Sequence, residues 1–155
     1  MPEGPEVRTT TDFLTQFTGK VLTGYSILSG RYSKKGNIPG EDIVILPAKF
    51  HAADCKGKFI YMTFAEGNHE YYLFSTLGMT GMWSSKKHKH ARFAMFFDDG
   101  TELYYNDIRN FGTLKFVNDK EVLSKKLKSL GPDVLTADID WKGFRNRFIK
   151  KQNKT

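Results

Sequence analysis

The stretch from Lys20 to Val117 most constrains the fold, because it consists of short apolar segments separated by turn residues. Gly67-Asn68 is a turn sequence, and Asp98-Asp99-Gly100 lies where a hairpin would close. The predicted strands cover residues 21–28, 43–46, 56–64, 71–74, 93–97, 101–105 and 112–117. In 56–64, Ile60, Met62 and Phe64 alternate with Phe59, Tyr61 and Thr63. Seven or eight short strands of this kind predict an antiparallel sandwich or barrel.

Helical patterns lie on both sides of this region. Residues 5–18 are expected to form a helix that ends near Gly19, with one apolar stripe made of Val7, Thr10, Leu14 and Phe17 beside Phe13. Residues 119–130 predict a second helix before Gly131-Pro132, and a basic amphipathic helix is expected from Asp140. The fold class is therefore α+β: an N-terminal helix packed on a two-layered antiparallel sandwich or barrel, followed by two C-terminal helices.

Composition narrows the class of protein. A chain of 155 residues is long enough for one well-buried core. Cys55 is its only cysteine, which excludes an intrachain disulfide and a cysteine-based zinc site, so no metal or cofactor is expected. No run approaches the ~20 apolar residues of a membrane span, and no export signal is present. An intracellular monomer is expected, in a cytoplasm or nucleoid, a nucleus or a viral factory.

Positive charge gathers near the C-terminal end. The chain has a net charge of +7, and residues 141–155 hold six cations and no acid: Lys142, Arg145, Arg147, Lys150, Lys151 and Lys154. Such asymmetry favours a polyanionic partner, with nucleic acid ahead of a membrane surface. A solvated helix face is the alternative explanation.

The first six residues, Met1-Pro2-Glu3-Gly4-Pro5-Glu6, combine two prolines with two carboxylates. If Met1 is removed, the nitrogen of Pro2 becomes a secondary amine, which can attack carbon and form an iminium intermediate. Glu3 lies beside that amine, and Glu6 follows on the same helical face. An ordinary helix start, with acids complementing the helix dipole, explains the same residues.

Four further segments contain residues that suit DNA chemistry. Lys58 begins a strand and can act as acid, base or phosphate contact, or can simply protect a strand edge. Met79, between Gly78 and Gly81, can wedge between bases or belong to the core. Residues 86–90 form a basic run that suits phosphate or a solvated loop. Arg109 and Phe111, two apart in an extended segment, can fill the space of an extruded base or form a surface turn.

Taken together and in this order, these motifs resemble the formamidopyrimidine-DNA glycosylase / endonuclease VIII family. The matching sequences are MPEGPEV at the N-terminus, GKF at 57–59, LGMTG at 77–81, HKH at 88–90, DIRNFG at 107–112, LGPDVL at 130–135 and FRNRFIKKQNKT at 144–155. With Gly4 between Glu3 and Pro5, the N-terminal motif resembles the endonuclease VIII branch more than the formamidopyrimidine branch.

The resemblance implies a role for each candidate residue. Pro2 would be the nucleophile at C1′ of the damaged nucleotide, Glu3 the general acid/base, and Glu6 its support. Lys58 would serve β-elimination and hold a phosphate. Three residues would fill the void after base flipping: Met79, Arg109 and Phe111. Three residues would hold DNA: His90, Arg109 and Lys154.

The resemblance also implies a domain plan and a function. Residues 1–118 would be the catalytic domain, and 119–155 the start of a helix–two-turn–helix domain. The expected activity is excision of oxidised bases, pyrimidines foremost, from damaged double-stranded DNA, followed by nicking at the abasic site. The family continues past this length with the rest of that domain and a finger, so the chain is expected to be a fragment, a split gene product or a natural truncation. A catalytically impaired DNA-binding fragment is the alternative, and a generic β-rich single-strand-binding module is a third.

Overall fold

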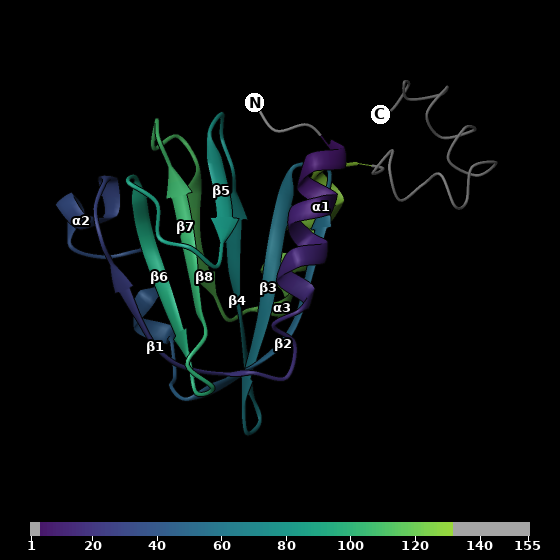
Figure 1. Ribbon diagram of the computed structural model, residues 1–155. Coiled ribbons are helices and arrows are strands. Elements are labelled where there is room, and N and C mark those ends of the chain that lie inside the picture. Colours follow the sequence, from purple (N-terminus) through teal and green to yellow (C-terminus); the bar gives the residue numbers. More distant parts are fainter. Residues whose placement is uncertain (1–3, 132–155) are drawn as a thin grey trace. The chain divides into compact units, whose positions relative to one another are not determined.

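The computed structural model describes residues 4–131 and divides the chain into two compact units, Met1–Asn118 and Asp119–Thr155 (Figure 1). In the first unit, α1 (Gly4–Thr15) precedes the sheet, and two short helical segments follow the first strand: α2 (Arg31–Lys35) and the 3-10 helix η1 (Glu41–Ile43). The strands are β1 (Val21–Ile27), β2 (Ala48–Lys56), β3 (Phe59–Glu66), β4 (His69–Thr76), β5 (Gly81–Ser84), β6 (Ala91–Phe97), β7 (Glu102–Asp107) and β8 (Thr113–Val117).

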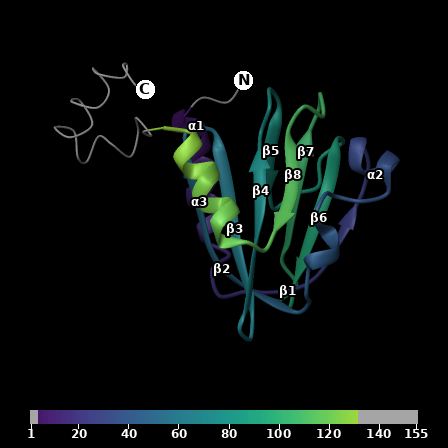
Figure 2. The same ribbon diagram turned by 180° about the vertical axis from the view of Figure 1, so that it is seen from behind.

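The eight strands form one antiparallel sheet in the order β5-β7-β6-β1-β2-β3-β4-β8. Its two halves meet at β1 and β2, where only Val21 pairs with Lys49 and Leu22 with Ala48. Because this junction is so short, the sheet folds over into two layers of four strands, seen from both sides in Figures 1 and 2. The antiparallel, two-layered fold expected from the sequence is confirmed.

Large aromatic and aliphatic side chains fill the space between the layers. The alternation expected along β3 is confirmed, since Ile60, Met62 and Phe64 are fully buried in the core cluster. Phe116 of β8 meets Phe93 of β6 across the layers, with ring centroids 6.5 Å apart. Contacts of this kind join strands that do not share backbone hydrogen bonds.

Two strand assignments made from the sequence are wrong. Residues 43–46 are not a strand, because η1 ends at Ile43 and the backbone forms no ladder before Pro47. Residues 56–64 are not one strand either: β2 ends at Lys56, a turn with Gly57 at φ 59° follows, and β3 begins at Phe59. Most of β2 was missed because its middle, His51-Ala52-Ala53-Asp54, has low intrinsic strand preference. Backbone pairing with β3 overrides that preference.

Two further elements were not expected. The stretch from Ser29 to Gly40, interpreted as a loop, contains the single-turn helix α2. The second is β5, which was assigned to a bend because its four residues, Gly81-Met82-Trp83-Ser84, are too few to show a period. Pairing with β7 makes this segment a strand.

Helix α1 packs against β2 and β3 and also reaches β5 (Figure 1). Val7, Leu14 and Phe17 are buried as expected, but Thr11 replaces Thr10 on the buried face. The Thr11 hydroxyl donates to the carbonyl of Val7 at 2.9 Å, so its burial leaves the hydroxyl satisfied. The helix begins at Gly4, the residue that follows Glu3.

In the second unit, α3 (Lys120–Ser129) confirms the helix expected at 119–130. Asp119 caps it by accepting the backbone N–H of Glu121 at 2.9 Å. The basic helix expected from Asp140 and the DNA contact Lys154 lie outside the described residues. No helix within residues 4–131 is long and apolar enough to cross a membrane.

Buried tyrosines predict a loss of stability in alkali. Burial raises the pKa of Tyr25, Tyr71 and Tyr105 above the ordinary value, and burial with a hydrogen bond to Glu70 raises the pKa of Tyr72 to about 12. An unfolded chain ionises its tyrosines near pH 10 while the folded one does not, so stability is complete below pH 10 and falls as pH rises toward 12. Urea unfolding at pH 8 and pH 11 measures this, and equal midpoints would contradict it.

Candidate active site

Two neighbouring loops present exposed side chains at one end of the sandwich. The β4–β5 loop (Leu77–Thr80) carries Met79, which is 44% exposed. The β7–β8 loop (Ile108–Gly112) carries Phe111, which is 54% exposed, and Arg109, which is also exposed. The segment containing Arg109 and Phe111 is not extended as expected, because Asn110 between them takes a left-handed conformation with φ 58°. A tight bend therefore presents both side chains to solvent.

Backbone contact between two glycines joins these loops. Gly78 has φ 60°, and a Cβ placed on it would lie 2.7 Å from the nitrogen of Gly112. A Cβ on Gly112 would lie 1.6 Å from the Tyr105 hydroxyl and 2.5 Å from the carbonyl oxygen of Thr76. Any side chain at either position would push the loops apart. Met79 lies in a turn, and Gly78 directly before it allows this close approach.

The side chain of Asp107, which is 1% exposed, connects the same two loops. Its Oδ1 accepts the Thr80 hydroxyl at 2.5 Å and the Asn110 N–H at 3.0 Å. Its Oδ2 accepts the Gly112 N–H at 2.8 Å. The Thr80 hydroxyl oxygen in turn accepts the N–H of Arg109 at 2.9 Å, which ties the two loops together a second time.

Glu6 and Met79 line one pocket of about 370 Å³. Glu6 comes from the first turn of α1, and the rest of the lining comes from Thr10 and from residues 77–82. This pocket brings a candidate catalytic carboxylate to the loop that carries a candidate wedge. Pro2 and Glu3 immediately precede α1, but they lie outside the described residues.

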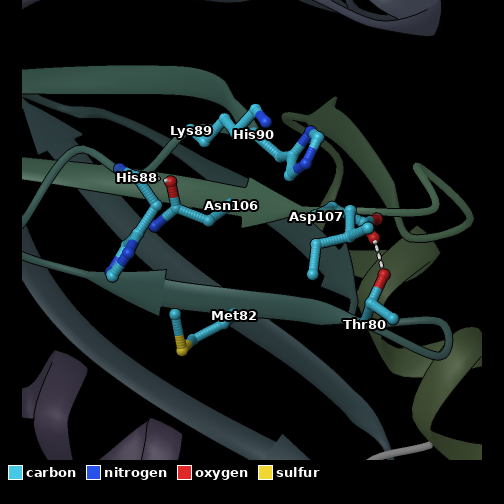
Figure 3. Close-up of a pocket in the computed structure, with 8 residues that line it drawn as sticks. Thr80, Met82, His88, Lys89, His90, Asn106 and Asp107 are labelled. Carbon is cyan, nitrogen blue, oxygen red and sulfur yellow. Dashed lines mark hydrogen bonds between the residues drawn. The ribbon is translucent and has the colours of Figure 1, made fainter.

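A second pocket, of about 500 Å³, contains His90 (Figure 3). It lies over the end of β7, between Met82 of β5 and the basic loop (Lys86–His90) that joins β5 to β6. Thr80 and Met82 line both pockets, so the two are neighbours. Its lining combines Lys89, His88 and His90 with the apolar side chains of Met82 and Ile108, a set that suits a phosphate beside an apolar group.

Lys58 lies in the turn between β2 and β3, at the end of the sandwich that carries the β4–β5 loop, because Phe59 pairs with Thr76. Its side chain is exposed, and it precedes β3 by one residue, whereas the sequence placed it at the start of a strand. The structure thus brings together Glu6 and Met79, and also Arg109 and Phe111 with the loop of Met79. Asp107, Thr80 and Asn106 were not assigned roles from the sequence. The sequence carries no signal for them, because their burial and their hydrogen bonds to distant loops arise only in the folded chain.

Exposure of Met79 and Phe111 predicts that neither contributes much to folding. Met79→Ala and Phe111→Ala are expected to change the free energy of unfolding by less than about 0.5 kcal/mol. Leu114→Ala, at a buried position of the adjacent strand, is expected to cost about 2 to 5 kcal/mol. Chemical denaturation of the three variants measures the difference. A large loss for Met79→Ala or Phe111→Ala would mean that these side chains serve the core.

Comparison with known proteins places the chain in a family. Residues 1–114 match the formamidopyrimidine-DNA glycosylase N-terminal domain, so the chain belongs to this family. Formamidopyrimidine-DNA glycosylase of Oceanobacillus iheyensis is 34% identical over 97% of this chain, and that of Acinetobacter baylyi is 30% identical over 98%. The chain spans about half the length of these relatives, 57% and 55% respectively.

Solved structures agree on the fold. The MutM (Fpg) protein of Thermus thermophilus is 28% identical, with a TM-score of 0.58 over 76% of this chain and 41% of that one. Lactococcus lactis Fpg, in a crystal with DNA that contains an oxidised pyrimidine, has a TM-score of 0.65 at 22% identity, over 82% and 48%. The sandwich and its N-terminal helix are therefore those of this family.

Proposed function

We propose that this chain is the catalytic part of a DNA glycosylase and abasic-site lyase that acts on oxidised bases in double-stranded DNA. The observation that carries the proposal is that Glu6 and Met79 line the same pocket. In this chain of the family, Pro2 and Glu3 directly precede the helix that positions Glu6. Glu6 is positioned by α1 against the loop that would enter the DNA.

The chemistry follows from an N-terminal amine and nearby acids. The nitrogen of Pro2 attacks C1′, the bond from C1′ to the base breaks, and the base leaves with a proton. Glu3 protonates the ring oxygen so that the sugar opens to an iminium, and Glu6 supports it. Removal of a C2′ proton then expels the 3′-phosphate by β-elimination. Lys58 takes part in this step and also holds a phosphate. Water finally releases the proline amine.

Base extrusion needs replacement contacts in the duplex. Flipping costs a few kcal/mol of stacking and pairing. Met79, Arg109 and Phe111 are the groups that fill the void, and their exposure on two joined loops supports this assignment. His90 contacts phosphate from the basic loop, as Lys154 does near the C-terminal end.

Oxidised pyrimidines are the expected lesions. Gly4 in the N-terminal motif favours the endonuclease VIII-like branch, and this resemblance is the basis of the expectation. Lactococcus lactis Fpg has been crystallised with DNA that contains an oxidised pyrimidine and with DNA that contains Fapy-dG, so these are the two lesions to compare. Residues 1–118 form the catalytic domain of this proposal, and 119–155 begin a helix–two-turn–helix domain. The protein would act inside the cell as a monomer.

A second candidate function is recognition of damaged DNA without turnover. It is favoured by the six cations of residues 141–155, which can hold DNA whether or not a chemical step follows. This candidate predicts lesion-selective binding and no covalent intermediate. It fails if binding shows no preference for a lesion, or if deletion of residues 141–155 removes binding while covalent trapping survives.

Borohydride trapping tests the main proposal. The full chain is incubated with a duplex that contains the oxidised pyrimidine 5-hydroxyuracil, and with a second duplex that contains an abasic site, in the presence of sodium borohydride. Reduction of the iminium to a stable amine yields a protein–DNA adduct on a denaturing gel. Absence of an adduct with either duplex, for protein whose intact mass shows removal of Met1, would refute the proposal.

A further inference from the structure

The last two residues of β7 are buried polar side chains to which the proposed chemistry assigns no role. Asn106 is 4% exposed and Asp107 is 1% exposed. Burying an amide or a carboxylate is costly unless its hydrogen-bonding capacity is filled. Asp107 fills that capacity by holding the β4–β5 and β7–β8 loops, and Asn106 by holding the basic loop. All three loops carry residues proposed to contact DNA.

Asp107 is saturated by groups of the β4–β5 and β7–β8 loops and their flanking strands. A carboxylate has about four acceptor positions. Three are filled by Thr80, Asn110 and Gly112, and the hydroxyl of Tyr105 lies 3.2 Å from Oδ2. Because one carboxylate binds both loops, Thr80, the residue next to Met79, is tied to the loop that carries Arg109 and Phe111.

Asn106 holds the basic loop in the same manner. Its Oδ1 accepts the N–H of His88 at 3.2 Å, and its Nδ2 donates to the carbonyl of Lys86 at 3.4 Å. The N–H of Asp107 donates to the carbonyl of His90 at 3.0 Å. The position of the basic loop therefore depends on the Asn106 side chain and the β7 backbone, and not on the carboxylate of Asp107.

We propose that Asp107 is a positioning residue for base extrusion, which holds Met79, Arg109 and Phe111 as one preformed wedge, while Asn106 separately positions the phosphate-contacting basic loop. A wedge that is already ordered enters the duplex without a further loss of conformational entropy, which would otherwise be added to the cost of flipping. This inference rests on the proposed function. It separates base extrusion, which depends on Asp107, from phosphate contact, which depends on the adjacent residue Asn106.

Thr80→Val tests the wedge most cleanly, because it removes the hydroxyl between Asp107 and the Arg109 amide with little change of volume. Borohydride trapping is expected to slow about tenfold on the 5-hydroxyuracil duplex, the effect of losing about 1.4 kcal/mol of buried hydrogen bonding. On a single-stranded abasic oligonucleotide the change is expected to stay within about twofold, since nothing has to be extruded. Thr80→Ser keeps the hydroxyl and should restore the duplex rate.

Thr101→Val is the matched control. Its hydroxyl also donates to an aspartate, Asp99 Oδ1 at 2.6 Å, but in the turn at the opposite end of β7. It should leave both rates unchanged. Asn106→Ala should weaken binding to the duplex and the single strand by similar factors, because the basic loop serves both. Equal slowing of both substrates by Thr80→Val, or no slowing of either, would overturn the proposal.

Hydrogen exchange separates failure of this inference from failure of the proposed function. If the wild-type chain forms no adduct, the enzymatic function fails, and loop positioning is then measured in the free protein. Thr80→Val should speed exchange of the Arg109 amide by about tenfold, the effect of its lost acceptor, while Thr101→Val leaves that amide unchanged. Unchanged exchange in Thr80→Val would overturn the positioning role by itself.

Discussion

Pro2→Thr will abolish the borohydride-trapped adduct, reducing it by at least about 100-fold. A terminal proline has a secondary amine, whose attack on C1′ leads directly to a cationic iminium that activates C2′ for elimination. Threonine offers only a primary amine, without the ring that restricts the geometry of the nitrogen. Trapping on an abasic duplex measures the effect without requiring base excision.

Pro5→Ala is the matched control for that experiment. Pro5 belongs to the same motif and is exposed in the first turn of α1, but its nitrogen is an amide in every form of the chain. Its replacement should leave trapping within about twofold of the wild type. Protein that retains Met1 should form no adduct, because resonance removes nucleophilicity from an amide nitrogen. If Pro2→Thr formed as much adduct as the wild type, the nucleophile would be an amine other than that of Pro2.

Gly112→Ala will destabilise the sandwich by about 3 kcal/mol or more. The new methyl group would lie 2.5 Å from the Thr76 carbonyl oxygen, a backbone atom of β4 that cannot move without breaking the pairing of β4 with β8. It would also displace the Tyr105 hydroxyl, 1.6 Å away, from the Asp107 carboxylate. Urea denaturation measures the loss, and the variant should trap the duplex lesion poorly because Phe111 shifts with the loop.

Gly24→Ala provides the comparison, since it adds the same methyl group where no atom lies within 4 Å. Gly24 lies in β1, has an ordinary negative φ, and is expected to tolerate alanine within about 0.5 kcal/mol. Similar denaturation midpoints for the two variants would show that the loops relax around Gly112. In that case the glycine contact would not determine where Phe111 lies.

Much of the fold was predictable from local patterns in the sequence. Alternation separated Ile60, Met62 and Phe64 from Phe59, Tyr61 and Thr63, and the structure places the first set in the core cluster. Asp98-Asp99-Gly100 identified the β6–β7 hairpin. Strand β2 was largely missed because its polar centre is held in place by pairing with β3, a long-range effect that residues 51–54 do not reveal.

The candidate site also divides into residues that local motifs indicate and residues whose role depends on long-range contacts. Residues with reactive or exposed groups, such as Glu6, Met79 and Phe111, were identified from motifs. The residues that hold them could not be, since the importance of Asp107 depends on Thr80, 27 positions earlier in the chain. Hydrogen bonds between distant loops leave no periodic signal in the sequence, and they become visible only when the sheet brings β5 and β7 together.

The strand order also has a consequence for how the domain reaches its folded state. Strand β1 pairs with β6, matching residue 22 with residue 97, and β8 pairs with β4, matching residue 113 with residue 76. Each layer is therefore completed by a strand distant in sequence, which gives the topology a high contact order and predicts slow folding. Until β8 is synthesised, β4 presents an unpaired edge that can recruit a strand of another molecule. An expression product for biophysical work should accordingly extend at least to Val117.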